Sequence, residues 1–232
     1  MTTPAPWQPR GTVYGTLLNF QREHALWAPR MAEAPYKAAP KAPVLYVKTA
    51  NTFAHYGAAV SVPGEVWVSA SLGLVVGNSD QNRALAQYGQ AQAAIKTGSL
   101  PGVIGCVLLA DLSLPHESYY RPPIKFRNRD GFLVCAPAVT PLALAELAGL
   151  QIETRINGTL VQTQDLSTLV RDAAALLADV SEFMTLQPGD VLMLGTDCLP
   201  DGTRPLAKAG DRIDIRAPGL AALHHTLIQE AA

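Results

Sequence analysis

Short apolar runs broken by proline and glycine dominate the pattern of hydrophobic and polar positions along the chain. Eighteen prolines and eighteen glycines interrupt stretches rich in Val, Ile, Leu and Thr, and they leave turn-bounded pieces of strand length. The predicted strands are Thr12–Asn19, Val44–Lys48, Glu65–Val76, Val103–Asp111, Gly131–Ala136, Gln151–Ile156, Val191–Gly195 and Asp211–Ile215. The pattern therefore predicts a mainly β protein with a few helices, of the α+β class.

Two segments carry helical spacing instead of strand spacing. Asn82–Thr97 is rich in Ala and Gln, and Ser167–Met184 repeats apolar residues every three to four positions. Both helices are expected to pack on the sheets. A third segment, Gln21–Lys41, is polar and punctuated by proline, which predicts a short helix and an exposed loop. This segment is equally compatible with a mobile lid over a site and with an ordinary surface connection.

The charge balance and the cysteines narrow the function classes. Eighteen basic and nineteen acidic side chains leave a formal charge of -1, without the positive excess typical of nucleic-acid-binding and membrane-surface proteins. A small molecule or another protein is the expected partner. Cys106, Cys135 and Cys198 form no Cys-x-x-Cys pair, which predicts buried thiols rather than a zinc or redox site. Without a signal-peptide pattern or a run of about 18 apolar residues, the expected compartment is the cytoplasm.

The segment from Ala110 to Gly131 has the most unusual chemistry. Asp111 follows an apolar strand, and a short, proline-stiffened span then brings four cations together: Arg121, Lys125, Arg127 and Arg129. Guanidinium groups make paired hydrogen bonds to carboxylates, so this span predicts a site for an anionic ligand. The alternative is a solvated edge, in which these cations pair with the nearby acidic residues.

Other groups indicate less specific chemistry. His116 titrates near neutral pH and is a candidate general acid or base, although a histidine in a polar loop is more often simply exposed. His224 and His225 would point to opposite faces of a strand, which favours a structural role over metal binding. A nucleotide site is disfavoured because no phosphate-loop motif accompanies the glycines Gly57, Gly73 and Gly77.

Several segments resemble the fumarylacetoacetate hydrolase family. They are VYGTLLNF, VLYVKTANTF, SLGLVVG, LADLS followed by IKFRNRDGF, RINGTLVQTQD and LQPGDVLMLGT, in the family's order and across nearly the whole chain. The resemblance implies the mixed β roll of that family, here with residues 1–40 as an N-terminal strand and possible lid and residues 41–232 as the catalytic-type domain. The two parts would form one structural domain.

Two longer segments, DLSLPHESYYRPPIKFRNRDGF and VSEFMTLQPGDVLMLGT, are similar to one branch of the family. Members of that branch decarboxylate and isomerise intermediates of 4-hydroxyphenylacetate (homoprotocatechuate) breakdown and carry two copies of the fold. The resemblance is to the N-terminal copy, and it implies a separate N-terminal-type subunit. The implied substrates are 2-hydroxyhepta-2,4-diene-1,7-dioate and its precursor 5-oxopent-3-ene-1,2,5-tricarboxylate.

The resemblance also implies site residues. The family holds a divalent cation, usually magnesium, with a Glu-x-Glu pair and a later aspartate, and a downstream lysine contacts the substrate or a metal-bound water. Asp111 matches the aspartate, Lys125 matches the lysine, and Thr196 matches a residue that meets the substrate carboxylate. Arg121 and Arg127 would add substrate contacts.

Two departures from the family pattern affect that assignment. Ser69 and Ser71 stand where the Glu-x-Glu pair is expected, and neutral hydroxyls do not replace the anionic ligands of a hard cation. The lid histidine of the family falls one residue late, at His24, with Glu23 in its place, so both residues are catalytic candidates. Asp111 is therefore a weak magnesium ligand by itself.

Two hypotheses follow. The first is an isomerase/decarboxylase subunit acting on a dicarboxylate or tricarboxylate, as a homodimer or with a related subunit. The second is a structural subunit that pairs with a metal-bearing partner resembling the C-terminal copy. Ser69 and Ser71 favour the second hypothesis, whereas Asp111, Lys125 and Thr196 favour the first.

Overall fold

The computed structural model describes residues 6–34, 37–77, 102–116, 124–142 and 144–231. The predicted helix Asn82–Thr97 and the candidate Arg121 lie outside these ranges. Within them, no helix is long and apolar enough to cross a membrane. Cys106, Cys135 and Cys198 are free and buried, which confirms the prediction made from their spacing.

The larger sheet contains the candidate residues of the 110–131 segment. In the described residues its strand order is β2-β1-β10-β5-β6-β7-β3, and β11 pairs with β5. Its strands are β1 (Val13–Leu17), β2 (Val44–Lys48), β3 (Phe53–Ala54), β5 (Val66–Val76), β6 (Val103–Ser113), β7 (Leu133–Cys135), β10 (Val191–Met193) and β11 (Leu206–Ala207). Strands β5 and β6 are almost entirely buried, which explains their nearly continuous apolar sequences.

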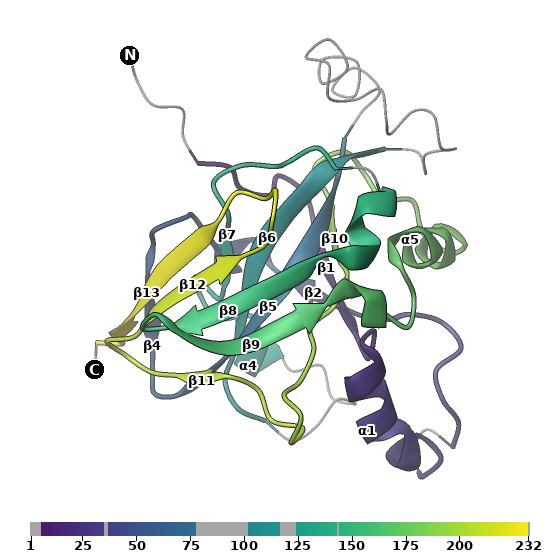
Figure 1. The fold of residues 1–232 in the computed structure, drawn as a ribbon, viewed down its shortest axis with the longest axis horizontal. Helices are drawn as coiled ribbons and strands as arrows, with labels where there is room; N and C mark the ends of the chain where they lie inside the picture. Colours follow the sequence, from purple (N-terminus) through teal and green to yellow (C-terminus); the bar gives the residue numbers. More distant parts are fainter. Residues whose placement is uncertain (1–5, 35–36, 78–101, 117–123, 143, 232) are drawn as a thin grey trace.

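The second sheet has the order β4-β13-β12-β8-β9 among the described strands. It is formed by β4 (Ala59–Val62), β8 (Gln151–Ile156), β9 (Thr159–Asp165), β12 (Arg212–Arg216) and β13 (Leu223–Gln229). Figure 1 shows this sheet lying across the long strands β5 and β6. Apolar side chains from both sheets make one core, so the two sheets form a single packed unit.

Helices α1 (Gln21–Met31) and α5 (Ala173–Ser181) lie on the right of the sheets in Figure 1, whereas the short α4 (Ile124–Arg127) lies near their middle. Helix α1 confirms the short helix predicted in Gln21–Lys41, and these three are the α-helices of the described residues. Three 3-10 turns complete the described structure: η1 (Ala50–Thr52), η2 (Leu144–Gly149) and η3 (Leu166–Thr168). The α+β, mainly β prediction is confirmed.

One predicted helix is wrong in its extent. Ser167–Met184 was expected to be continuous, but the chain breaks between η3 and α5. Asn19 causes this break through two hydrogen bonds. Its backbone carbonyl accepts from the Val170 backbone N–H at 2.8 Å, and its side-chain oxygen accepts from the Arg171 backbone N–H at 2.9 Å. Asp172 then caps α5 by accepting from the Ala175 N–H.

All eight predicted strands are present within a few residues, whereas β3, β4, β9, β11 and β13 were missed. Strand β9 buries Gln162 and Gln164 on the inner face of the second sheet, so its sequence lacks the usual apolar alternation. On β13, His225 is buried and His224 is partly exposed, which confirms that they face opposite sides.

Gly15 makes room for a side chain of the candidate site. It lies directly across from Tyr46 in the β1–β2 pairing, and a Cβ at Gly15 would overlap the Tyr46 ring. The glycine in the VYGTLLNF segment therefore allows the ring to lie against the β1 backbone.

Gly15→Ala is expected to destabilise the protein by about 1–3 kcal/mol, because a methyl group overpacks the space of the Tyr46 ring. Urea unfolding followed by circular dichroism measures the change. Gly64→Ala is the matched control, because nothing lies within 4 Å of its added Cβ. Equal stability of the two variants would contradict the assigned packing.

His225 gives the stability a pH dependence. Burial, followed by the neighbouring His224, lowers the pKa of His225 to about 3. The unfolded chain therefore binds one more proton than the folded chain between pH of about 6.5 and 3, so stability decreases as the pH falls through this window. His225→Leu should remove a slope of up to about 1.4 kcal/mol per pH unit between pH of about 6.5 and 5. Urea unfolding across this window, with the exposed His55→Gln as control, tests it.

Candidate active site

Asp111 is the centre of a buried cluster of ion pairs and hydrogen bonds. Its Oδ1 accepts from Lys48 Nζ at 2.9 Å, and its Oδ2 accepts from the Tyr46 hydroxyl at 2.5 Å and from an Arg127 guanidinium nitrogen at 3.0 Å. Asp111, Lys48 and Arg127 are each less than 5 % exposed. Both carboxylate oxygens of Asp111 are therefore occupied by side chains of the protein.

Three separate elements supply this cluster. Tyr46 and Lys48 lie two residues apart on β2, so strand geometry points both side chains to the same face. Asp111 comes from β6 and Arg127 from the last residue of α4. The Arg127 guanidinium also lies over the Tyr46 ring, 4.6 Å from its centroid, a distance typical of a cation–π contact.

The hydrogen bonds of Lys48 show that its amine is charged. An ammonium group has three donors, and Lys48 Nζ meets three acceptors: Asp111 Oδ1, the Leu112 carbonyl at 3.3 Å and the Arg127 carbonyl at 2.5 Å. Burial lowers the pKa of Lys48, and Asp111 opposes that shift. Burial alone would raise the pKa of Asp111, but Lys48, Arg127 and hydrogen bonds together hold it below 3.8. The three acceptors around Nζ and the lowered pKa of Asp111 both favour the ionised form of the pair.

Tyr46 remains protonated in this environment. Burial, followed by the negative charge of Asp111, raises the pKa of Tyr46 well above its ordinary value of 10.0. Its hydroxyl therefore donates to Asp111.

Ser69 joins this cluster to a second group of buried polar residues. Ser69 lies directly across from Asp111 in the β5–β6 pairing. Its hydroxyl lies 3.4 Å from Arg204 NH1, which also donates to Thr196 Oγ1 at 3.0 Å and to the Asp197 carbonyl at 3.1 Å. Ser71 donates to the Gly195 carbonyl at 2.8 Å. The positions that match the Glu-x-Glu pair thus contact a guanidinium and a backbone carbonyl.

Helix α1 reaches the same place through Glu23. The Glu23 carboxylate is buried and forms an ion pair with Arg204, whereas the neighbouring His24 is partly exposed. Of the two lid candidates, the structure therefore brings Glu23 into the buried group. Arg22, one residue before Glu23, donates to the Cys198 carbonyl and pairs with Asp197 at 3.3 Å. These contacts anchor α1 to the loop that contains Asp197 and Cys198.

These residues do not fit a divalent cation. Ser69 and Ser71 carry no charge, both carboxylate oxygens of Asp111 already accept from protein side chains, and Glu23 is paired with Arg204. A hard cation prefers several anionic oxygens, and here it would lie beside buried positive charges instead. In the described part of the chain, no three His, Cys, Asp or Glu side chains are grouped to hold a metal.

The other sequence candidates fall in different places. Thr196 is buried against Arg204, and Arg127 contacts Asp111. Lys125, expected to contact the substrate or a metal-bound water, is exposed on α4, whereas Arg127 on the same helix is buried. The catalytic role assigned to Lys125 stays a prediction.

Sequence reasoning missed Tyr46, Lys48 and Arg204. Lys48 had a signal, because a lysine ending a short apolar strand, two residues after a tyrosine, shares that residue's face. Arg204 lies in a loop with no such pattern.

His116 lies beside both groups. Its ring stacks against Phe126 at 5.3 Å and lies near Trp67 at 5.1 Å, and Nδ1 is 2.8 Å from the Leu114 carbonyl. Burial lowers the pKa of His116, and the charges of Arg127 and Arg204 act in the same direction. A neutral imidazole that donates from Nδ1 keeps Nε2 as a proton acceptor, so His116 can serve as a general base.

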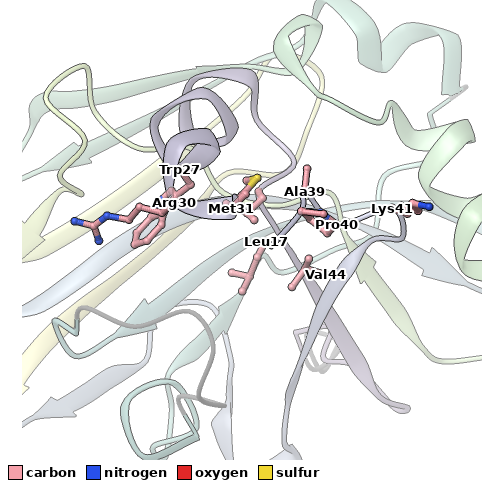
Figure 2. Close-up of a pocket in the computed structure, with 10 residues that line it drawn as sticks. Leu17, Trp27, Arg30, Met31, Ala39, Pro40, Lys41 and Val44 are labelled. Carbon is pink, nitrogen blue, oxygen red and sulfur yellow. The ribbon is translucent and has the colours of Figure 1, made fainter. Parts of the chain in front are cut away.

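A separate cavity of about 400 Å³ lies between α1, β1, β2 and the segment Ala38–Lys41. Figure 2 shows Met31 and Leu17 facing its apolar interior, while the Arg30 guanidinium points away. Among the described residues, its lining includes no carboxylate or histidine of the kind present around Asp111.

Asp111→Asn is expected to destabilise the protein by about 3–5 kcal/mol, because Lys48 and Arg127 lose their buried counter-charge. Thermal or urea unfolding measures the loss. Glu153→Gln removes one carboxylate from the exposed Arg155 pair and should cost at most about 1 kcal/mol. An Asp111→Asn variant as stable as this control would show that the cluster does not support the fold.

Comparison with known proteins gives these residues a family context. Residues 12–228 match the family model described as fumarylacetoacetate (FAA) hydrolase C-terminal. The chain is 35% identical over 226 residues to the 4-hydroxyphenylacetate degradation bifunctional isomerase/decarboxylase of Salmonella dublin. That alignment covers 95% of this chain and 48% of the relative, so the chain spans about half the length of the curated relatives it matches.

Solved structures share the fold. A 5-carboxymethyl-2-hydroxymuconate delta-isomerase from Mycobacterium smegmatis superposes with a TM-score of 0.68 at 20% identity, covering 98% of this chain and 82% of that one. A maleylpyruvate hydrolase from Sphingobium sp. SYK-6, solved with manganese(II) and pyruvate, gives a TM-score of 0.66 at 20% identity, covering 99% and 74%. A divalent cation thus occurs with this fold, although the residues around Ser69 do not suit one. The family match over almost the whole chain and the shared fold together show that the chain belongs to the fumarylacetoacetate hydrolase family.

Proposed function

We propose that the chain is a subunit of an isomerase/decarboxylase of 4-hydroxyphenylacetate catabolism. Its substrates would be 2-hydroxyhepta-2,4-diene-1,7-dioate and 5-oxopent-3-ene-1,2,5-tricarboxylate. The similarity to the bifunctional isomerase/decarboxylases over 95% of the chain supports the pathway. Three free, buried cysteines suit a reducing cytoplasm, where we place the protein, as a homodimer or with a related subunit.

The observation that carries this proposal is the buried positive charge around Asp111 and Ser69. Lys48, Arg127 and Arg204 are all buried there, and two carboxylates, Asp111 and Glu23, pair with them. Arg127 Nε is also buried and has no hydrogen-bond partner within the described residues. A substrate carboxylate would add the anion that this group of charges accommodates.

The same charges suit the proposed chemistry. Loss of CO2 from the tricarboxylate leaves an electron pair on carbon as an enolate, and isomerisation moves a proton through a similar dienolate. Fixed positive groups stabilise such developing negative charge when they are already oriented. His116 is the proposed proton acceptor, because burial lowers its pKa, which favours the neutral imidazole, and the charges of Arg127 and Arg204 act on it in the same direction.

A second candidate function is a structural subunit that pairs with a metal-bearing relative of the C-terminal type. The specific observation in its favour is that Ser69 and Ser71 bind Arg204 and a backbone carbonyl instead of carrying carboxylates. In this form the chain would stabilise a partner's active site without turning over substrate itself.

Turnover separates these two functions. The chain, treated with EDTA, is assayed for isomerisation of 2-hydroxyhepta-2,4-diene-1,7-dioate by ultraviolet absorbance, alone and mixed with a family member that has the Glu-x-Glu pair. Turnover by the chain alone is the expected result. An inactive chain that increases the partner's own rate would replace our proposal with the structural subunit. No effect in either experiment would reject both.

Arg127→Ala and Lys125→Ala should each weaken binding of a C7 2-oxo dicarboxylate, by about 1.5–3 kcal/mol per lost charged hydrogen bond. Isothermal titration calorimetry with 2-oxoheptanedioate measures the affinity, and Arg155→Ala, at an exposed ion pair, is the control. Unchanged affinity in both variants would show that neither side chain contacts the ligand and that Arg127 serves only its buried ion pair with Asp111.

A further inference from the structure

We propose that Arg204 is a built-in cation of the site and that its guanidinium binds one carboxylate of the substrate in exchange with Glu23. The identity of that ligand, a 2-oxo or 2-hydroxy carboxylate, rests on the proposed function. The binding itself is tested without turnover.

Arg204 lies beside the positions at which the family pattern places the ligands of a divalent cation. Ser69 matches the first position of the Glu-x-Glu pair and faces Asp111 across β5 and β6. Arg204 NH1 reaches Ser69 at 3.4 Å and Thr196 at 3.0 Å, and the residue is only 7% exposed. The place where the family pattern predicts a metal therefore lies next to the permanent positive charge of Arg204.

The groups around Arg204 are suited to an anion. A guanidinium presents its N–H donors in a planar fork that matches a carboxylate. The hydroxyls of Ser69 and Thr196 accept from Arg204, and each keeps its own O–H to donate to a ligand oxygen. One cation and two hydroxyl donors thus converge on the same place.

Gln162 adds an acceptor beside this place. Its Nε2 donates to the Asp197 carbonyl at 3.0 Å, the same oxygen that accepts from Arg204 NH1. Gln162 is 4% exposed, and within the described residues its Oε1 has no hydrogen-bond partner. A buried acceptor without a donor is costly, and the hydroxyl of a 2-hydroxy-dienoate would satisfy it. Arg204 and Gln162 share the Asp197 carbonyl as an acceptor, and a cation with a free acceptor nearby favours an enol next to a carboxylate.

Glu23 already supplies a carboxylate to Arg204 in the free protein. Helix α1 is held against the Asp197–Arg204 loop by Arg22, whose guanidinium contacts Asp197 and the Cys198 carbonyl. Leu26 lies over Gly202 on the same side of the helix, where a Cβ at Gly202 would strike it. The helix thus presents Glu23 as an internal anion, and a substrate carboxylate competes with it.

Calorimetry on the EDTA-treated full chain tests this site with 2-oxoheptanedioate, a saturated 2-oxo dicarboxylate that cannot be isomerised. The wild type should bind the probe, and added Mg²⁺ should leave the affinity unchanged. Arg204→Gln should weaken binding by about 10- to 100-fold, the loss expected for charged hydrogen bonds. Glu23→Gln should tighten binding several-fold, because the competing charge is gone. Arg212→Gln, which removes an exposed arginine that pairs with Asp214 in the second sheet, should bind as the wild type does.

Arg204→Gln leaves Glu23 buried without its ion-pair partner, so the double variant Glu23→Gln/Arg204→Gln is measured as well. This neutral pair is expected to fold, as thermal unfolding would show, and to bind the probe as weakly as the single Arg204 variant. Three results would overturn the proposal: no probe binding by the wild type, binding that requires Mg²⁺, or wild-type affinity in the folded double variant. Failure of the proposed function looks different, because the probe would bind through Arg204 while the dienedioate is not turned over.

Discussion

The ionised pairing of Asp111 with Lys48 and Arg127 is the interaction on which the arrangement of this site depends. Three elements meet at that carboxylate: the end of β2, the interior of β6 and the end of α4. Each charge is almost completely buried, so each is tolerable only while its partners stay in place. The pairing therefore holds α4 and the end of β2 against β6. It also removes Asp111 from any role as an available metal ligand.

Around that fixed pairing, the chain carries buried charges of its own where the resemblance to the family implies a metal site. Serines occupy the two positions where the family pattern has glutamates, and Arg204 fills the adjoining space. A divalent cation with three carboxylates and a guanidinium with two hydroxyls both provide a positive centre for an anion. They differ in reach and strength, since a guanidinium binds through directional hydrogen bonds and does not act as a Lewis acid.

Helix α1 connects this chemistry to the rest of the molecule. Its first turn brings Glu23 to Arg204, and its last turn places Met31 over the apolar cavity beside β1 and β2 (Figure 2). Movement of this helix would therefore alter both the charge balance at Arg204 and the shape of that cavity. Under our proposal, binding of a substrate carboxylate at Arg204 would be linked to the position of the helix through Glu23.

The sequence by itself determined the fold class and most of the larger sheet, because buried strands such as β5 and β6 have long, nearly continuous apolar sequences. It also marked Asp111, Arg127 and Thr196 through a recognisable order of segments. It could not pair Lys48 with Asp111, Arg204 with Ser69 or Glu23 with Arg204, because these partners lie 63, 135 and 181 positions apart. No periodicity or local spacing encodes such contacts. Only the tertiary structure, by placing β2, β6 and the Asp197–Arg204 loop together, decided which charges share the interior.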